Sequence, residues 1–171
     1  FLLIEYLKLI VLYLKNGISW LRLDAVGFIW KRSGSRCIND KNAHKLVKII
    51  RLLLNILIDN GVLVTETNVP EKENLSYLVT QDEANIAYNF PLPPLLLEAI
   101  ISQNTDLLNN WLKSWPSLPK NTLLLNFTSC HDGVGLIPLK GLMSDFRINN
   151  LLSECEDKGG LISHRTLSEG K

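Results

Sequence analysis

Short apolar runs that alternate with longer helical patterns constrain the fold of this 171-residue chain more than any other feature. Four of these runs are rich in Val, Leu and Ile and have the length of buried strands. Strands that are apolar on both faces are typical of parallel sheets covered by helices, because only there are both faces buried. The expected strands are residues 18–24, 62–68, 85–90 and 122–128.

Helical patterns precede and separate these strands. Apolar residues recur at helical spacing in residues 43–59, and Pro93-Pro94 opens a second helix over 95–114 with a break near Asn104. An amphipathic helix is expected over 2–14 and a weaker one over 140–157. The polar residues between Pro70 and the strand at 85–90 are expected to form a loop.

Polar side chains gather at the carboxyl ends of the expected strands. In a (β/α)8 barrel all of these ends converge on one mouth, where such enzymes keep their active sites. No glycine-rich phosphate-binding motif follows any strand, which disfavours an open nucleotide-binding sheet. We therefore expect an α/β fold that is part of a (β/α)8 TIM barrel, roughly strands 4–7 with their helices. The strand-end residues are Arg22 and Asp24, then Glu66, then Asn89, then His131 and Asp132.

Three of these residues are carboxylates, namely Asp24, Glu66 and Asp132. Glycosidic bond chemistry needs one carboxylate as a nucleophile and a second as general acid and base. A third can stabilise the oxocarbenium-like transition state. The residue types alone therefore indicate an enzyme that acts on glycosides.

The sequence around these residues resembles a known family. LRLDAVGF, VLVTETNVP and NFTSCHDGVGL are similar to the second, third and fourth conserved regions of the α-amylase superfamily, glycoside hydrolase family 13. The text from LDAVGF to HDGVGL resembles the sucrose phosphorylase-like branch of that superfamily. Within this branch, TETNVP and the loop after it look most like the glucosylglycerate phosphorylases.

The resemblance implies a role for each candidate residue. Asp24 would be the nucleophile that forms a covalent β-glucosyl-enzyme, and Arg22 would keep its carboxylate ionised and oriented. Glu66 would be the general acid/base. Asp132 would stabilise the transition state through the glucose hydroxyls, and His131 would bind the same sugar. With inorganic phosphate as acceptor, the product would be α-glucose 1-phosphate with retained configuration; no cofactor and no metal are expected.

The sequence also departs from the family's pattern. The first conserved region of the superfamily, with its Asp and Asn-His pair, has no counterpart here. Ile137 stands where the phosphorylases have an arginine, and His164 where a tyrosine is expected. We therefore expect a partial catalytic barrel over 1–158, the start of a further segment over 159–171, and no activity from the chain alone. An α-glucosidase or transglycosylase of the same superfamily, or a non-catalytic remnant, remain as alternatives.

Several of these residues also have ordinary structural readings. Arg22 and Asp24 could form a structural ion pair, Glu66 could cap a loop, and His131-Asp132 could belong to a turn before Gly133. The basic loop with Lys31, Arg32 and Arg36 could attract phosphate or could simply be solvated. The presence of all three carboxylates at matching strand ends favours the catalytic reading.

Composition limits the partners. With 18 Lys and Arg against 17 Asp and Glu the charge is balanced, which disfavours nucleic acid. Glu5 and Lys8 interrupt the apolar N-terminal run, so no membrane partner is expected. Cys37, Cys130 and Cys155 are odd in number and widely spaced, which predicts reduced thiols and a cytoplasmic protein. The expected partners are an α-glucoside, phosphate and the remainder of the barrel.

Overall fold

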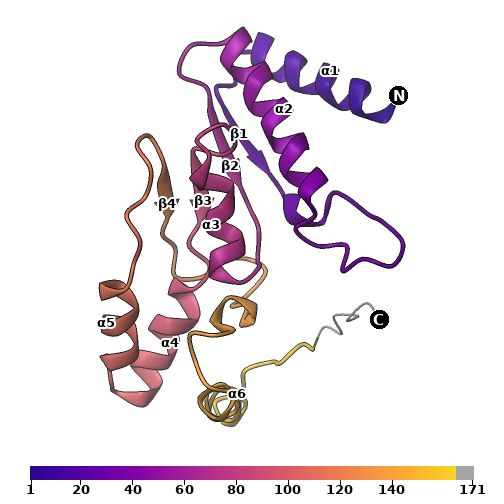
Figure 1. Ribbon diagram of the computed structural model, residues 1–171. Helices are drawn as coiled ribbons and strands as arrows, with labels where there is room; N and C mark the ends of the chain where they lie inside the picture. The colour runs from indigo at the N-terminus through magenta and orange to yellow at the C-terminus, as the bar shows by residue number, and fades with distance from the viewer. Residues whose placement is uncertain (165–171) are drawn as a thin grey trace.

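A parallel β-sheet forms the centre of the computed structural model, which describes residues 1–164 (Figure 1). Four strands in this part of the chain pair in the order β1-β2-β3-β4, so each strand lies beside the next in sequence. Trp20 pairs with Val62, and Ile86 pairs with Leu123. The strands are β1 (Trp20–Leu23), β2 (Val62–Thr65), β3 (Ile86–Tyr88) and β4 (Leu123–Leu125).

Helices connect the strands; the N-terminal helix and the helices after β1 and β2 cover one face of the sheet, whereas the later helices lie beyond one end of it (Figure 1). This sequential parallel connectivity is that of part of a (β/α)8 barrel, so the predicted fold class is confirmed. The helices are α1 (Leu2–Lys15), α2 (Lys41–Leu57), α3 (Glu71–Val79), α4 (Leu92–Ser102), α5 (Asp106–Lys113) and α6 (Asp145–Asp157), with two short 3₁₀ turns, η1 (Val26–Phe28) and η2 (Ile137–Leu139). The division at 158 between barrel and following segment stays a prediction, and residues 165–171 lie outside the described residues.

The main core lies between the sheet and the helices α1, α2 and α3. The side chain of Asp40 caps α2 by accepting a hydrogen bond from the amide of Asn42 at 2.9 Å. One apolar stripe of α2 then packs on the sheet, as the helical spacing predicts. The buried residues of this core include Ala43, Val47, Ile50 and Leu54 of α2, Leu21 and Leu23 of β1, Leu63 of β2, and Ile10 and Leu14 of α1.

A second, smaller core joins α4, α5 and η2 at the other end of the molecule. Its buried members are Leu95, Trp111, Leu139 and Met143. Arg147 of α6 donates from Nε to the buried Glu98 carboxylate of α4 at 3.0 Å. This ion pair fixes α6 against α4.

Two predicted elements were wrong in part. The expected loop after Pro70 contains α3, whose buried residues Asn74, Tyr77 and Leu78 follow helical spacing. The weak helix expected from 140 begins only at Asp145, where the Ser144 side chain accepts from the amide of Arg147 at 3.4 Å. By contrast, the break between α4 and α5 lies close to Asn104, as predicted.

The second face of the sheet carries the residues that alternate along the strands with those of the main core. Arg22, Val64, Ile86 and Leu123 share this face, because they lie in one row of the parallel register. Val64 and Ile86 on the central strands are buried, whereas the outer strands expose Trp20 by 62% and Leu123 by 64%. This face corresponds to the inside of a barrel.

The described helices and cysteines bear on two further expectations. Within residues 1–164, none of the helices combines the length and the hydrophobicity that crossing a bilayer would require. Cys37, Cys130 and Cys155 all carry free thiols, in agreement with the expectation of reduced cysteines.

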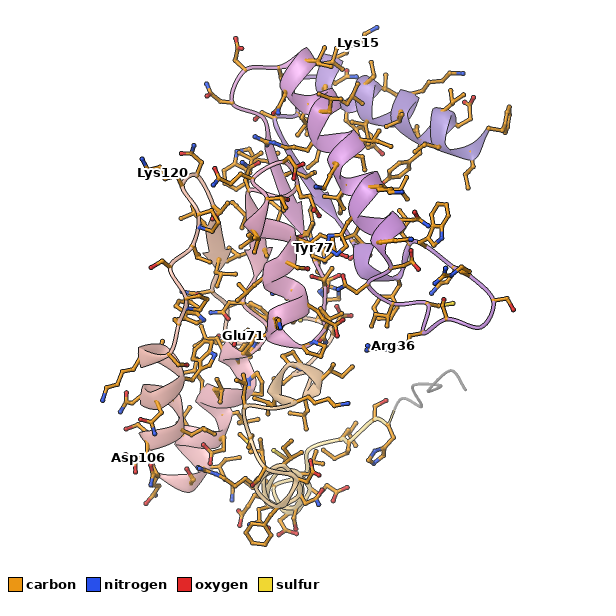
Figure 2. All side chains as sticks on the ribbon, viewed as in Figure 1. Lys15, Arg36, Glu71, Tyr77, Asp106 and Lys120 are labelled. Atoms are coloured by element: carbon orange, nitrogen blue, oxygen red, sulfur yellow. The ribbon has the colours of Figure 1, made fainter. Side chains whose placement is uncertain are left out.

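Tyr77 provides a test of the main core. Its ring is fully buried, stacks on His44 of α2 with centroids 4.2 Å apart, and points from α3 towards that helix (Figure 2). Its hydroxyl is buried without a hydrogen-bond partner among the described residues. Burial, together with the charges of Glu83 and Glu73, raises the pKa of Tyr77 above its ordinary value of 10.0.

We expect Tyr77→Phe to leave the free energy of unfolding within about 1 kcal/mol of wild type or to raise it, because it removes an unsatisfied buried hydroxyl. Tyr77→Ala, in contrast, should cost about 3–5 kcal/mol through cavity formation. In the unfolded chain the phenol ionises near pH 10, but in the folded chain it does so only at higher pH. Stability of the wild type should therefore fall as pH rises above about 10, and the Phe variant should lack this loss. Urea denaturation at several pH values measures the free energy of unfolding and its dependence on pH. A large decrease in this free energy in Tyr77→Phe at neutral pH would contradict the conclusion that the hydroxyl has no hydrogen-bond partner.

Candidate active site

Asp24 is the first residue after β1 and forms an ion pair with Arg22, which stands two residues earlier in the strand. Arg22 Nη1 lies 2.9 Å from Asp24 Oδ1. The Asp24 side chain is 72% exposed, so its free oxygen is open to a ligand. Ala25, at a φ of 45°, turns the chain sharply after Asp24 and takes it away from the sheet.

Glu66 follows β2 directly and lies beside Asp24, because the register pairs Leu23 with Thr65. Its side chain is only 14% exposed. Glu66 Oε2 accepts a hydrogen bond from the amide of Ala25 at 2.7 Å and lies 4.0 Å from Arg22 Nη2. The structure therefore brings Asp24 and Glu66 together, with one guanidinium between them.

The aromatic ring of Tyr88 and the two carboxylates surround the guanidinium of Arg22. Its guanidinium carbon lies 5.5 Å from the centroid of the Tyr88 ring on β3. Partial burial acts to lower the pKa of Arg22, but Tyr88, Asp24 and Glu66 outweigh this effect and the pKa is raised. Arg22 thus remains a permanent positive charge between the two carboxylates.

His131 and Asp132 lie in a turn after β4. The amide of Gly133 donates to the carbonyl of Cys130 at 3.1 Å, and His131 Nε2 lies 3.4 Å from Asp132 Oδ2. Both side chains are largely exposed. The turn expected from Asp-Gly is therefore present, and His131 contacts its neighbour Asp132.

A small cavity of about 40 Å³ joins this turn to the strand ends. Glu66 and Asp132 both line it, and the aromatic rings of Phe90 and Phe127 form part of its wall. Asp24 and His131 are not among the lining residues. Of the five candidate residues, the structure thus joins Arg22, Asp24 and Glu66 by direct contacts, joins Asp132 to Glu66 through a shared cavity, and leaves His131 outside it.

Asparagine side chains near the strand ends support this arrangement. Thr67 Oγ1 donates to Asn74 Oδ1 at 2.6 Å, and Asn74 Nδ2 donates to the carbonyl of Tyr88 at 2.7 Å. Asn89 Nδ2 donates to Asn126 Oδ1 at 2.8 Å. The end of β2 is thus tied to β3 through Asn74, and the end of β3 is tied to the end of β4. Sequence reasoning singled out Asn89 but missed Asn74 and Asn126; in Asn126 the only signal was its place directly after an apolar run.

The basic loop after β1 is engaged in its own contacts. Arg32 lies 3.6 Å from Asp40, and Arg36 lies 3.6 Å from Glu73 on α3 (Figure 2). These ion pairs favour the structural reading of the loop over phosphate attraction. Among residues 1–164, no group of three or more His, Cys, Asp or Glu side chains is arranged to hold a metal ion.

Comparison with known proteins agrees with this geometry, although no protein-family model matches the chain. The glucosylglycerate phosphorylase of Spirochaeta thermophila is 34% identical over 169 residues, and that of Escherichia coli is 37% identical over 169 residues. These alignments cover 99% and 98% of this chain. The sucrose phosphorylase of Bifidobacterium adolescentis is 28% identical over 152 residues, which is 81% of this chain and 27% of that enzyme.

The chain is thus similar over nearly its whole length to glucosylglycerate phosphorylases, in agreement with the sucrose phosphorylase-like branch of the α-amylase superfamily. The named relatives in this family are glycoside phosphorylases, that is, enzymes. The chain spans 29% to 30% of the length of the two glucosylglycerate phosphorylases. The resemblance deduced from the three motifs is therefore confirmed at the level of the family.

Proposed function

We propose that this chain carries the nucleophile and the general acid/base of a retaining α-glucosyl phosphorylase. The observation that supports this most directly is the placement of Arg22 between Asp24 and Glu66 at adjoining strand ends. Retaining chemistry needs two carboxylates side by side with different surroundings. Here one is open to solvent and paired with arginine, and the other is largely buried.

In the proposed reaction the Asp24 carboxylate attacks the anomeric carbon of an α-glucoside and forms a β-glucosyl ester. Glu66 donates its proton to the leaving oxygen, so the bond to the aglycone breaks without release of an alkoxide. Inorganic phosphate then attacks the anomeric carbon of this ester and displaces the Asp24 carboxylate, while Glu66 takes back a proton. Two inversions give α-glucose 1-phosphate with retained configuration.

The remaining candidate residues, Asp132 and His131, are proposed to bind the glucose unit. Asp132 lies at the cavity that also holds Glu66, where it can accept hydrogen bonds from glucose hydroxyls. His131 extends the same turn and is proposed to bind the same glucose. Phosphate acts as a co-substrate, and the mechanism calls for no cofactor. By the similarity to relatives named glucosylglycerate phosphorylase, the proposed donor is glucosylglycerate, and sucrose is the second choice.

Phosphate dependence tests the proposal. We would replace the matching segment of the Escherichia coli glucosylglycerate phosphorylase with residues 1–171 and assay glucosylglycerate with and without inorganic phosphate. We expect α-glucose 1-phosphate only when phosphate is present, at a turnover in the ordinary enzymatic range of about 1–10³ per second. Release of free glucose at the same rate without phosphate would instead identify a hydrolase.

The same assay on the 171-residue chain alone addresses the expectation that it is inactive by itself, which stays a prediction. A cytoplasmic location also stays a prediction, and it rests on the free thiols of the three cysteines. If the replacement protein folds but transfers no glucosyl group, the non-catalytic alternative gains support.

A further inference from the structure

Gly135 packs directly against the side chain of Asn68. A Cβ atom added to Gly135 would lie 2.4 Å from Asn68 Nδ2, closer than real Cβ atoms approach other groups, and 3.2 Å from Asn68 Cγ, so either the Asn68 side chain or the loop would have to move. The φ of Gly135 is not in the left-handed region, unlike that of Gly133 at 78°. The contact with Asn68, and not the backbone conformation, therefore favours glycine at 135.

Asn68 follows a residue that a side-chain hydrogen bond anchors. It stands two residues after Glu66, and the residue between them, Thr67, is anchored through Asn74. The Asn68 Oδ1 atom is buried without a hydrogen-bond partner among the described residues. Within the described residues no hydrogen bond holds the Asn68 Oδ1 atom, and Gly135 is a neighbour against which the side chain packs.

The segment 130–135 contains Asp132, and the contact of Gly135 with Asn68 connects this segment to the end of β2. Within the part of the chain that the structure describes, the hydrogen bonds of 130–135 are internal, such as those between Cys130 and Gly133. Asn68, Gly135, Glu66 and Asp132 line one cavity. The close approach of Asn68 to Gly135 therefore joins the strand end that holds Glu66 to the loop that holds Asp132.

We propose that Asn68 and Gly135 form a positioning contact that sets the distance between Asp132 and Glu66. Asn68 is in this view a positioning residue, since it acts on the reaction through the loop and not by contact with substrate. The catalytic consequence rests on the proposed glucosyl transfer. A displacement of about 1 Å at a reacting centre can lower a rate by on the order of 10²-fold.

A pair of complementary substitutions tests the contact. In the replacement protein described above, Gly135→Ala should lower kcat by about 10²-fold, because the new methyl group pushes the loop away from Asn68. Asn68→Ala should cost less, because it removes atoms without forcing the loop to move. The double variant Asn68→Ala/Gly135→Ala should recover most of the loss, because the smaller side chain leaves room for the methyl group. Asn109→Ala, on the exposed surface of α5, is the matched control and should behave as wild type.

Recovery of activity in the double variant distinguishes a positioning role from substrate binding by Asn68 and from a simple loss of stability. If Asn68 instead binds substrate, the two losses add and the double variant is the worst of the three, which would overturn the proposal. If Gly135→Ala only destabilises the protein, its melting temperature falls in step with activity, and kcat measured well below the melting temperature stays near wild type.

A second readout does not depend on activity. In the 171-residue chain with Cys37→Ser and Cys155→Ser, a trifluoromethyl tag on Cys130 reports the position of the loop by fluorine NMR. We expect one resonance in the parent, a shifted or broadened one in Gly135→Ala, and the parental resonance again in the double variant. The same spectrum in all three would overturn the proposed contact. If the replacement protein is inactive while the fluorine signals follow this pattern, the proposed function fails and the positioning contact stands.

Discussion

Replacement of Asp24 by Asn is expected to lower glucosyl transfer by at least about 10⁴-fold while the fold stays intact. An amide nitrogen or oxygen does not attack the anomeric carbon in place of a carboxylate, so the covalent intermediate fails to form. The shape of the side chain is kept, and the amide oxygen can still accept from Arg22, whose guanidinium lies 2.9 Å from Asp24 in the wild type. The measurement is kcat/KM for phosphorolysis, with mass spectrometry of the protein to detect the glucosyl ester.

The control for this variant is Asp59→Asn. Asp59 is an exposed carboxylate beyond the end of α2, so its loss changes the net charge equally without touching the site. It should keep wild-type kinetics. Near-normal turnover in Asp24→Asn, or a glucosyl ester that still forms, would require a different nucleophile.

Replacement of Glu66 by Gln is expected to show a dependence on the leaving group. Glutamine can still accept the hydrogen bond that Glu66 receives from the amide of Ala25, but it cannot donate and recover a proton. Substrates with poor leaving groups, such as glucosylglycerate and sucrose, should lose about 10²–10⁴-fold. α-Glucosyl fluoride needs little protonation on departure and should lose far less in the first step. A comparison of kcat/KM for the two classes of substrate measures this difference.

Glu156→Gln on the exposed side of α6 is the matched control and should treat both classes of substrate as wild type does. An equal loss for glucosyl fluoride and glucosylglycerate in Glu66→Gln would show that Glu66 does not act as the proton donor. The general acid would then have to be sought elsewhere.

The sheet and the neighbouring carboxylates were predictable because they depend on local pattern. Apolar runs predicted the strands, and in a parallel sheet residues at the ends of adjacent strands must lie side by side, which placed Glu66 next to Asp24. α3 was missed because Glu71, Lys72 and Glu73 make its first turn polar. Its buried face includes Asn74, which sequence patterns associate with loops.

The supporting contacts could not be predicted from the sequence. The hydrogen bonds of Asn74 to Thr67 and to Tyr88, and the packing of Asn68 on Gly135, join segments that are brought together only by the tertiary fold. Nothing in the local sequence of Gly135 distinguishes a glycine required by a neighbour from one required by a turn. The position of His131 beside Asp132 and outside the cavity likewise depends on how the loop folds.

The order of the strands also bears on how the chain folds. Each strand pairs with the next in sequence, but the separations differ: Trp20 and Val62 are 42 residues apart, Ile86 and Leu123 are 37 apart, and Val64 and Ile86 only 22. Loop-closure entropy makes the longest of these pairings about 0.6 kcal/mol more costly than the shortest. The β2-α3-β3 unit therefore has the smallest loop-closure cost of the three strand pairings. It already contains Glu66 and the hydrogen bonds of Asn74. The end of the strand that carries the proposed proton donor would thus be shaped early in folding, before β1 brings the nucleophile to it.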